Sequence, residues 1–410
     1  MTSSPRALIV SRLFPPEVGA GAFRLGALAR SLARHGSAVR VQTSVPPPHA
    51  PAAAEAKGVD VRRWPVLRDA GGNVRGYVQY MSFDVPLVLR MAFTRFDVVV
   101  AESPPTTGLV ATMIAALKRR PVVYYAADVW TDGVISMGAP RIVIGVMRGM
   151  ERAVLRRAQA IISVSEEVTE RLVGLDADPA KITTVGNGID TAVFSPDVAP
   201  IADEQYFVYT GTMSEWQQPE VFIRALAEIA EEHPAVRLRF FGQGSVEGDL
   251  KTLASELVPG RVEFGGVVSP AESAAWIRGA VASLVSIVPG IGYDFAKPTK
   301  TYAAAAVGTP VLFAGPATGA ALVRDAGLGY ASEFTPSDIA NRMRALLAEA
   351  GDGTTEQRRA ERATWAKTNV SLDAVADRVT AAISQVRRGG KTKLDAAADS
   401  APDRTEGPTP

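Results

Sequence analysis

Residues 297–316 read KPTKTYAAAAVGTPVLFAGP, and they carry the clearest signal of the fold. A polar turn containing Pro298 opens a short alanine-rich helix, Gly308 ends that helix, and an apolar strand follows from Pro310. Such a turn places free backbone N–H groups at a helix N-terminus, beside Lys297 and Lys300, at the edge of a parallel sheet. The stretch therefore predicts a site for a phosphate or pyrophosphate, in a protein that binds a phosphorylated small molecule.

The composition of the whole chain is that of a folded protein with room for two domains. It has 410 residues, of which 47% are hydrophobic. Because 44 basic residues balance 43 acidic ones, the charge does not favour nucleic acid as a partner. The absence of cysteine excludes disulfides and thiolate metal sites. We see no signal peptide before the first strand and no apolar run long enough to span a bilayer, so we expect a cytoplasmic protein.

Apolar strand candidates alternate with helical stretches along both halves of the chain. In the first half they lie at 7–10, 39–43, 97–101, 121–126 and 160–164, and the first is followed by a loop with glycines. In the second half they lie at 206–210, 236–241, 262–264, 281–287 and 311–313. Near-continuous apolar runs are typical of parallel strands buried on both faces. The sequence thus predicts two Rossmann-like, doubly wound α/β halves.

A polar, proline-containing segment near 195–204 predicts the linker between these halves. We expect an N-terminal domain over 1–198, a second domain over 199–370, and a C-terminal helix over 371–388 that packs back on the N-terminal domain. A polar tail over 389–410 should be disordered. Two α/β domains that face one another place the carboxyl ends of both sheets around a central cleft, where ligands of such sheets bind.

Two loops of the first half carry residue types that suit a ligand. The loop 15–22 contains Gly19 and Gly21, which would let the backbone approach a ligand or would simply make a strand-to-helix turn. It is not a dinucleotide-binding G-x-G-x-x-G, because Arg24 replaces the third glycine. Asp128, in the loop YAADVWTD over 125–132, could accept a hydrogen bond from a sugar hydroxyl or could cap a turn.

Three further segments close the first half or belong to the second. The turn-rich run VGNGIDTAVFSP over 185–196 has a mainly structural interpretation. The small-residue loops GTMSEWQQP at 211–219 and FGQGS at 241–245 each follow a strand, at the sheet edge where the 297–310 segment is expected. Three such loops that converge on one site are a stronger signal than any one of them.

Taken in order, these segments resemble the motifs of a retaining glycosyltransferase of the GT-B fold, the family 4-like or group 1 transferases that include bacterial enzymes of cell-envelope polysaccharide synthesis. The similar segments are FPPEVGAGAFRL, DVW at 128–130, NGIDTAVFSP, FGQG and PTKTYAAAAVGTPV. The likeness covers about residues 5–350. It implies metal-independent transfer of a sugar, hexosyltransferase-type, from a UDP-, GDP- or dTDP-sugar to a glycan, lipid-linked or small-molecule acceptor, with retention and with no other cofactor.

The resemblance also implies roles for individual residues. Asp128 would face the reacting sugar, and the acceptor would meet the first loop through Glu17, Gly19 and Gly21. The donor would bind the second domain, where its diphosphate meets helix N-termini and cations. The residues expected around the donor are Gly211, Thr212, Gly242, Gly244, Lys297, Thr299, Lys300, Thr301 and Tyr302. No residue is expected to bind a metal, and the DAD at 176–178 is interpreted as a solvated turn.

The chain departs from the family pattern at the donor site. The family's glutamate pair is missing, because Phe295 and Ala303 stand at those positions, and the second glutamate typically binds the donor ribose. Trp216, Gln217 and Gln218 replace the usual basic pair, and Ala127 replaces a histidine. An active but divergent transferase is the leading hypothesis. The alternatives are a non-catalytic sugar-nucleotide-binding or partner subunit and a sugar-nucleotide epimerase.

A peripheral membrane contact is a second interpretation of the helix predicted over 147–158. That segment carries Arg148, Arg152, Arg156 and Arg157, and a basic amphipathic helix can lie on anionic lipid. The preferred interpretation is a solvated helix face.

Overall fold

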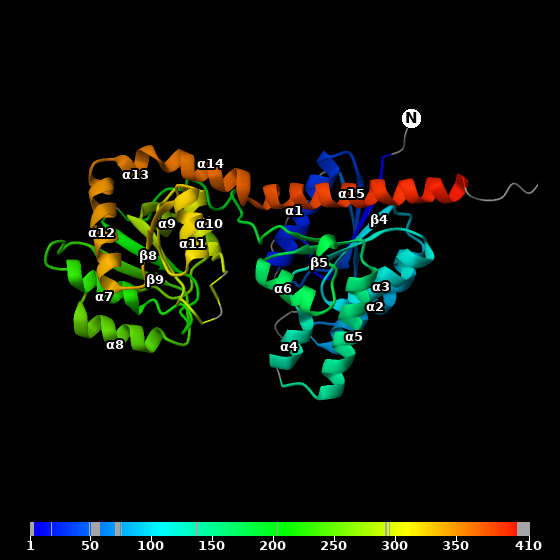
Figure 1. The fold of residues 1–410 in the computed structure, drawn as a ribbon, viewed down its shortest axis with the longest axis horizontal. Helices are drawn as coiled ribbons and strands as arrows, with labels where there is room; N and C mark the ends of the chain where they lie inside the picture. Colours follow the sequence, from blue (N-terminus) through cyan, green and yellow to red (C-terminus); the bar gives the residue numbers. More distant parts are fainter. Residues whose placement is uncertain are drawn as a thin grey trace, which may run out of the picture. The chain divides into compact units, whose positions relative to one another are not determined.

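The computed structural model describes residues 4–399 except 18, 49, 51–57, 70–73, 75, 137, 203, 292 and 295, and for 136 and 388–399 only the backbone. Contacts divide the chain into two compact units (Figure 1). The first consists of Met1–Gly186 together with Val375–Pro410, and the second is Asn187–Ala374.

The first unit is built on a parallel sheet of seven strands in the order β3-β2-β1-β4-β5-β6-β7. The strands are β1 (Arg6–Val10), β2 (Ala38–Ser44), β3 (Val59–Trp64), β4 (Val98–Glu102), β5 (Val122–Ala126), β6 (Ala160–Ser163) and β7 (Ile182–Thr184). Its helices are α1 (Ala20–Arg34), α2 (Tyr77–Ala92), α3 (Pro105–Leu117), α4 (Trp130–Ser136), α5 (Arg141–Arg157), α6 (Glu166–Gly174) and α15 (Leu372–Asp399), with the short 3-10 helix η1 (Pro179–Lys181).

Helices cover both faces of this sheet because its central strands are apolar on both sides. One face packs against α1 and α15, with Leu25, Leu28, Val379 and Ile383 in its core. The other packs against α2, α3 and α5. The α15 helix is also tied to α1 by polar contacts, since the Ser31 hydroxyl donates to Asp377 over 2.6 Å.

The second unit repeats the plan with six parallel strands in the order β10-β9-β8-β11-β12-β13. The strands are β8 (Tyr206–Thr210), β9 (Arg237–Phe241), β10 (Val262–Phe264), β11 (Ala282–Ser286), β12 (Val311–Ala314) and β13 (Gly329–Ser332). The helices are α7 (Glu220–Ile229), α8 (Glu247–Leu257), α9 (Pro270–Gly279), α10 (Thr299–Val307), α11 (Ala317–Asp325), α12 (Pro336–Gly351), α13 (Thr354–Gln357) and α14 (Arg359–Asn369). One face of this sheet packs against α7, α8 and α12, and the other against α9, α10, α11 and α14.

Local sequence signals explain where several of these helices begin and end. Ser269 and Glu272 form a capping box at the start of α9. Gly308 ends α10 in the left-handed conformation at φ 76°, as the sequence predicts. A side chain there would also collide with α14, because a Cβ would lie 2.5 Å from the Arg359 carbonyl oxygen. Arg362 then donates to the Gly308 carbonyl over 2.8 Å, which satisfies the buried end of α10.

The predicted fold class is confirmed: both halves are parallel-sheet, Rossmann-like α/β units, and every strand proposed from the sequence is present. Three strands were not predicted, β3, β7 and β13, and all three lie at sheet edges. An edge strand is partly exposed, so it lacks the continuous apolar run that marks a central strand. The units divide after Gly186, where the sequence suggested 198, and α15 extends to Asp399, past the expected start of the tail. Residues 400–410 lie outside the described part of the chain.

Candidate functional site

The strand orders fix where a ligand site is expected in each unit. In the second unit the order reverses between β8 and β11, and in the first between β1 and β4. Loops that follow the strands on either side of such a reversal diverge and leave a crevice at the carboxyl edge.

A pocket of about 510 Å³ occupies this position in the second unit. Its lining comes from the loop after β8, the start of α10, one residue of α9 and two residues that precede β8. These residues are Thr210, Gly211, Thr212, Trp216, Gln217, Pro298, Thr299, Lys300, Ala303, Ser273, Ile189 and Phe194. The structure therefore brings together four of the nine residues predicted around the donor: Gly211, Thr212, Thr299 and Lys300. Ile189 and Phe194 belong to the segment 185–196, which the sequence suggested was mainly structural.

Two of the predicted glycines shape the pocket from behind its wall. The loop after β9 lies against the loop after β8, so that a Cβ on Gly242 would be 2.0 Å from the Gly211 carbonyl oxygen. A Cβ on Gly244 would be 1.8 Å from the Met213 carbonyl oxygen. Gly211 and Gly242 also adopt φ values of 111° and 132°, which favour glycine. Gly242 and Gly244 do not line the pocket; they allow the two loops to approach each other.

The start of α10 points unsatisfied donors at the pocket. Pro298 is its N-cap and has no N–H, while the Thr301 N–H bonds the Pro298 carbonyl over 3.0 Å. In the described part of the chain, the N–H groups of Thr299 and Lys300 donate to no backbone carbonyl. Both residues line the pocket. A helix N-terminus with free amides attracts an anion.

Lys300 adds a positive side chain to these amides. Its Nζ lies 3.5 Å from the centre of the Tyr209 ring and 3.4 Å from the Thr212 carbonyl oxygen. The residue keeps partial exposure, but its ammonium is surrounded by protein, and burial lowers the pKa of Lys300 well below its usual value. No carboxylate among the described residues forms an ion pair with Lys300. Its partners are the carbonyl dipole of Thr212 and the face of the Tyr209 ring. In the described part of the chain, the charged form of Lys300 therefore has no carboxylate counter-ion.

Hydrogen bonds hold this arrangement rigid. Tyr209 is buried, and its hydroxyl lies 2.8 Å from the Thr212 carbonyl oxygen and 2.9 Å from Gln217 Oε1. The Trp216 ring stacks on Tyr293 at 4.9 Å, which joins the loop after β8 to the loop after β11. Two of the residues that replace the family's basic pair, Trp216 and Gln217, thus shape the pocket without adding charge.

The remaining predicted donor residues lie off the pocket wall. Lys297 is exposed and Thr301 is buried, and neither they nor Tyr302 line the pocket. Ala303 does line it, with 7% of its surface exposed, where the family's ribose-binding glutamate is expected. Ser273 on α9 also lines the pocket, and its hydroxyl is available to a ribose. No motif in the sequence points to this residue. Phe295 lies outside the described residues.

In the first unit, the carboxyl edge of β1, β4 and β5 holds a second group of polar side chains. Glu102, at the end of β4, is buried and accepts a hydrogen bond of 2.6 Å from the Ser11 hydroxyl. Arg24 Nη2 lies 3.6 Å from Glu102 Oε1, and burial raises the pKa of Glu102. Gly21 is required beside it, because a Cβ there would be 2.7 Å from Glu102 Oε1.

The residues predicted for the acceptor and the reacting sugar occupy different environments. Asp128 follows β5 and is exposed, and partial desolvation of its carboxylate raises its pKa. Glu17 is buried and forms an ion pair of 2.8 Å with Arg68, so it braces the loop from inside. Gly19 is the N-cap of α1 in extended backbone, with open space around it.

Arg12 is a candidate that the sequence analysis missed. It directly follows β1, is only 8% exposed, and stacks over the Tyr80 ring at 3.9 Å from its centre. Its Nη1 has no hydrogen-bond partner among the described residues, and burial lowers its pKa. Tyr80 in turn meets the Trp130 ring edge to face at 5.5 Å. A buried cation with a free donor is a feature of binding sites.

The described residues contain no group of three or more histidine, cysteine or acidic side chains arranged for a metal ion. No helix in them is both long and apolar enough to cross a membrane. Of the DAD segment, Asp176 pairs with Arg152 and Arg156, and Asp178 caps η1.

Comparison with known proteins identifies both units. Residues 19–188 match the model of the glycosyl transferase 4-like domain, and residues 204–349 match that of the glycosyl transferases group 1. A D-inositol 3-phosphate glycosyltransferase of Nocardioides is 30% identical over 48% of this chain and 48% of its own length. One of Streptomyces scabiei is 27% identical over 58% of this chain and 57% of its own length. The chain thus spans about half the length of the curated relatives it matches.

Solved structures show the same fold at low identity. Sucrose-phosphate synthase from Thermosynechococcus elongatus superposes with a TM-score of 0.63 at 17% identity, covering 96% of this chain and 100% of its own. Anabaena HepE in complex with UDP and glucose gives 0.58 at 15%, covering 92% and 99%. The two family models, in this order and over most of the chain, agree with the motifs and with the paired sheets. The chain belongs to the group 1, family 4-like glycosyltransferases of the GT-B fold.

Proposed function

We propose that this chain transfers a sugar from a nucleoside-diphosphate sugar to a hydroxyl of an acceptor, with retention at the anomeric carbon. The observation that carries the proposal is the pocket at the carboxyl edge of β8, where Lys300 has no carboxylate partner among the described residues. It stands beside two amides of α10 that donate to no backbone carbonyl of the described chain. These groups suit a diphosphate.

The reaction requires that the negative charge developing on the leaving nucleoside diphosphate be stabilised. The bond between the anomeric carbon and the β-phosphate oxygen breaks, and the nucleoside diphosphate leaves with the electron pair. The acceptor oxygen bonds to the same carbon and loses its proton. Lys300 and the amides of Thr299 and Lys300 would stabilise the negative charge that develops on the leaving phosphate. In this scheme the side chain and the helix supply the charge, and no step calls for a metal ion.

The sugar and the ribose of the donor would lie against the rest of the pocket wall. Ala303 offers no carboxylate to the ribose, so the hydroxyl of Ser273 and the amide of Gln217 would take over this contact. Asp128 would face the reacting sugar, since its raised pKa suits a group close to a proton in transfer. HepE holds UDP and glucose in its solved complex. We infer a UDP-, GDP- or dTDP-sugar as donor.

The acceptor would meet the first unit. Arg12, whose Nη1 has no hydrogen-bond partner among the described residues, suits an acceptor that carries an anionic group. The relatives in Nocardioides and Streptomyces are named for such a compound, D-inositol 3-phosphate. A phosphorylated small molecule, a lipid-linked phosphate and a glycan phosphate would each present such an anionic group. A peripheral membrane contact would favour the lipid-linked form.

The test is a panel of UDP-, GDP- and dTDP-sugars, with the melting temperature and the release of nucleoside diphosphate as two readouts. We expect one base to raise the melting temperature and to be released when an acceptor is added. Stabilisation by no nucleotide would refute the proposal. Stabilisation without release, whatever the acceptor, would favour the non-catalytic alternative that the missing glutamates suggest. Release of a free epimer without transfer would identify an epimerase.

A further inference from the structure

The outer surface of α2 is apolar and exposed. The inner face of α2 buries Phe83, Leu87 and Met91 against the sheet. Apolar residues recur at helical spacing on the other face as well, and these are exposed: Val78, Met81, Val85, Leu89 and, just past its end, Phe93. A helix that is apolar on both faces is typical of a protein core or of a membrane interface.

The neighbouring helix α3 extends this apolar surface. It packs beside α2, in one helix layer on the same face of the sheet (Figure 1). Met113 and Leu117 are exposed on it, and Phe93 and Leu117 are 87% and 81% exposed. Both helices return to the amino edge of a parallel sheet, so their C-terminal ends lie at the same edge. The α2–α3 face, defined by Val78, Val85, Leu89, Phe93, Met113 and Leu117, is a candidate for docking.

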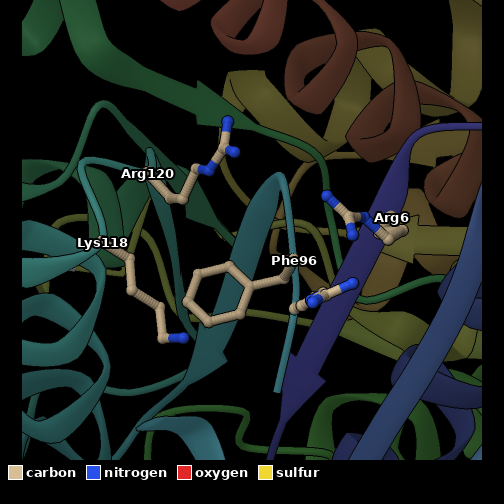
Figure 2. A pocket seen from close by; sticks show the side chains of 5 residues that line it. Arg6, Phe96, Lys118 and Arg120 are labelled. Carbon is tan, nitrogen blue, oxygen red and sulfur yellow. The ribbon is translucent and has the colours of Figure 1, made fainter. Parts of the chain in front are cut away.

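A basic pocket lies at the same edge, where the two helices end. It measures about 410 Å³ and is lined by Arg6, Arg95, Phe96, Lys118 and Arg120. The side chains of Arg6, Lys118 and Arg120 surround the Phe96 ring (Figure 2). Arg95 and Phe96 follow α2, and Lys118 and Arg120 follow α3, so the basic pocket continues the α2–α3 face.

The charges of this region are not balanced by acids. Asp97 pairs with Arg6 at 3.0 Å and lies 3.7 Å from Arg120. Among the described residues no ion pair engages Arg95 or Lys118. Over 76–96 and 105–120 the one acidic residue is Asp84, and it is buried. A protein surface that must stay in water mixes both signs of charge, whereas this one combines exposed apolar side chains with four cations and the single partly exposed acid Asp97.

We propose that the α2–α3 face and the basic pocket dock this chain on an anionic lipid bilayer. The apolar side chains enter the boundary between headgroups and acyl chains, and Arg95, Lys118 and Arg120 contact lipid phosphates. The charge complementarity selects this occupant over a second copy of the chain, whose own basic pocket would be repelled. The contact differs from the one that the α5 arginines suggest, because Arg152 and Arg156 are already engaged by Asp176.

The proposal goes beyond sugar transfer and can be tested without turnover. Full-length protein is sedimented with vesicles of phosphatidylcholine alone or of phosphatidylcholine and phosphatidylglycerol in equal amounts, at low and high salt. We expect at least about tenfold stronger binding to the anionic vesicles, fading at high salt as exposed charges are screened. Free inorganic phosphate at millimolar concentration should not compete.

Two pairs of variants locate the contact. Leu89→Ser with Phe93→Ser, and Arg95→Glu with Lys118→Glu, should each reduce vesicle binding at least about tenfold. Because these side chains are exposed or line an open pocket, the melting temperature should stay unchanged. The control is Arg148→Glu with Arg157→Glu on α5, which makes the same change in net charge and should keep binding.

Three outcomes overturn the proposal. The first is no binding of the parent protein to anionic vesicles. The second is equal loss of binding in the α5 control, which would indicate attraction by net charge alone. The third is a concentration-dependent dimer in sedimentation velocity that Leu89→Ser with Phe93→Ser dissolves, which would make a second copy the occupant of the face.

Discussion

Replacing Lys300 with methionine removes a cation from the pocket of the second unit and keeps an unbranched apolar stem. The ammonium lies 3.5 Å from the centre of the Tyr209 ring and 3.4 Å from the Thr212 carbonyl oxygen. Burial lowers the pKa of Lys300, and no carboxylate among the described residues forms an ion pair with it. The anion that completes the site must come from the ligand.

The size of the effect follows from these surroundings. A phosphate oxygen about 4 Å from the ammonium gains about 4 kcal/mol at the effective dielectric near a protein surface. Desolvation of both ions removes much of this gain, and a charge-assisted hydrogen bond keeps a net of about 1–3 kcal/mol. We therefore expect Lys300→Met to weaken binding of the nucleoside diphosphate about 5–150-fold.

The pH dependence gives a sharper readout than the affinity alone. Since burial lowers the pKa of Lys300, its amine is neutral in the free protein over the range between that lowered pKa and the usual lysine value. A bound diphosphate favours the protonated form of Lys300, so the complex takes up a proton when it forms in this pH range. The affinity for the diphosphate therefore falls as the pH rises through this range. The heat of binding should then depend on the ionisation enthalpy of the buffer.

Titration calorimetry with UDP, GDP and dTDP from pH 7 to 9.5, in Tris and in a buffer of low ionisation enthalpy, measures both quantities. Lys251→Met is the matched control, because Lys251 lies on α8, pairs with Glu247 and does not line the pocket. Two results would refute the reasoning. One is equal affinity of Lys300→Met and Lys251→Met for every nucleotide; the other is proton uptake that persists in Lys300→Met.

Two other predictions concern stability and are checked by urea denaturation. Gly244→Ala should lower the free energy of unfolding of the second unit by about 1–3 kcal/mol, because its Cβ would lie 1.8 Å from the Met213 carbonyl oxygen. Gly248→Ala, with open space around its Cβ on α8, should raise it by about 0.5–1 kcal/mol, and equal stability of the two would contradict the loop contact. Burial raises the pKa of Glu102, so the folded state binds its proton more tightly, and the free energy of unfolding should fall as pH rises from about 4.3 through the raised pKa. Glu102→Gln can keep the bond from Ser11 and should lose this slope, whereas an unchanged slope would assign it to another group.

The fold could be predicted from the sequence because its strongest signals are local. Central strands such as β4 and β8 are unbroken apolar runs, and the end of α10 is marked by Gly308. The strands that escaped prediction are edge strands with mixed composition. Contacts divide the units after Gly186, whereas the sequence suggests 198, because the proline-containing linker at 195–204 is more conspicuous than the turn that precedes it.

The sequence motifs name only part of the pocket lining. Gly211, Thr212, Thr299 and Lys300 meet in one pocket, as their motifs suggest. Ser273 and Arg12 could not be found this way, because their importance comes from tertiary neighbours. Ser273 comes to the pocket on a helix far from the motifs in sequence, and Arg12 is distinguished by burial against Tyr80.

The path of α15 has a consequence for how the chain folds during synthesis. The core of the first unit includes Val375, Val379 and Ile383, which follow the entire second unit in the sequence. A ribosome therefore releases the whole sheet of the first unit long before the helix that, together with α1, covers one of its faces. Until then the part of that face beside Ser31 of α1 and Val185 lacks its cover, and the nascent first unit is open to chaperones and to aggregation. A termination codon just before α15 would leave that part of the face permanently uncovered, even in a product that retains all of the donor pocket.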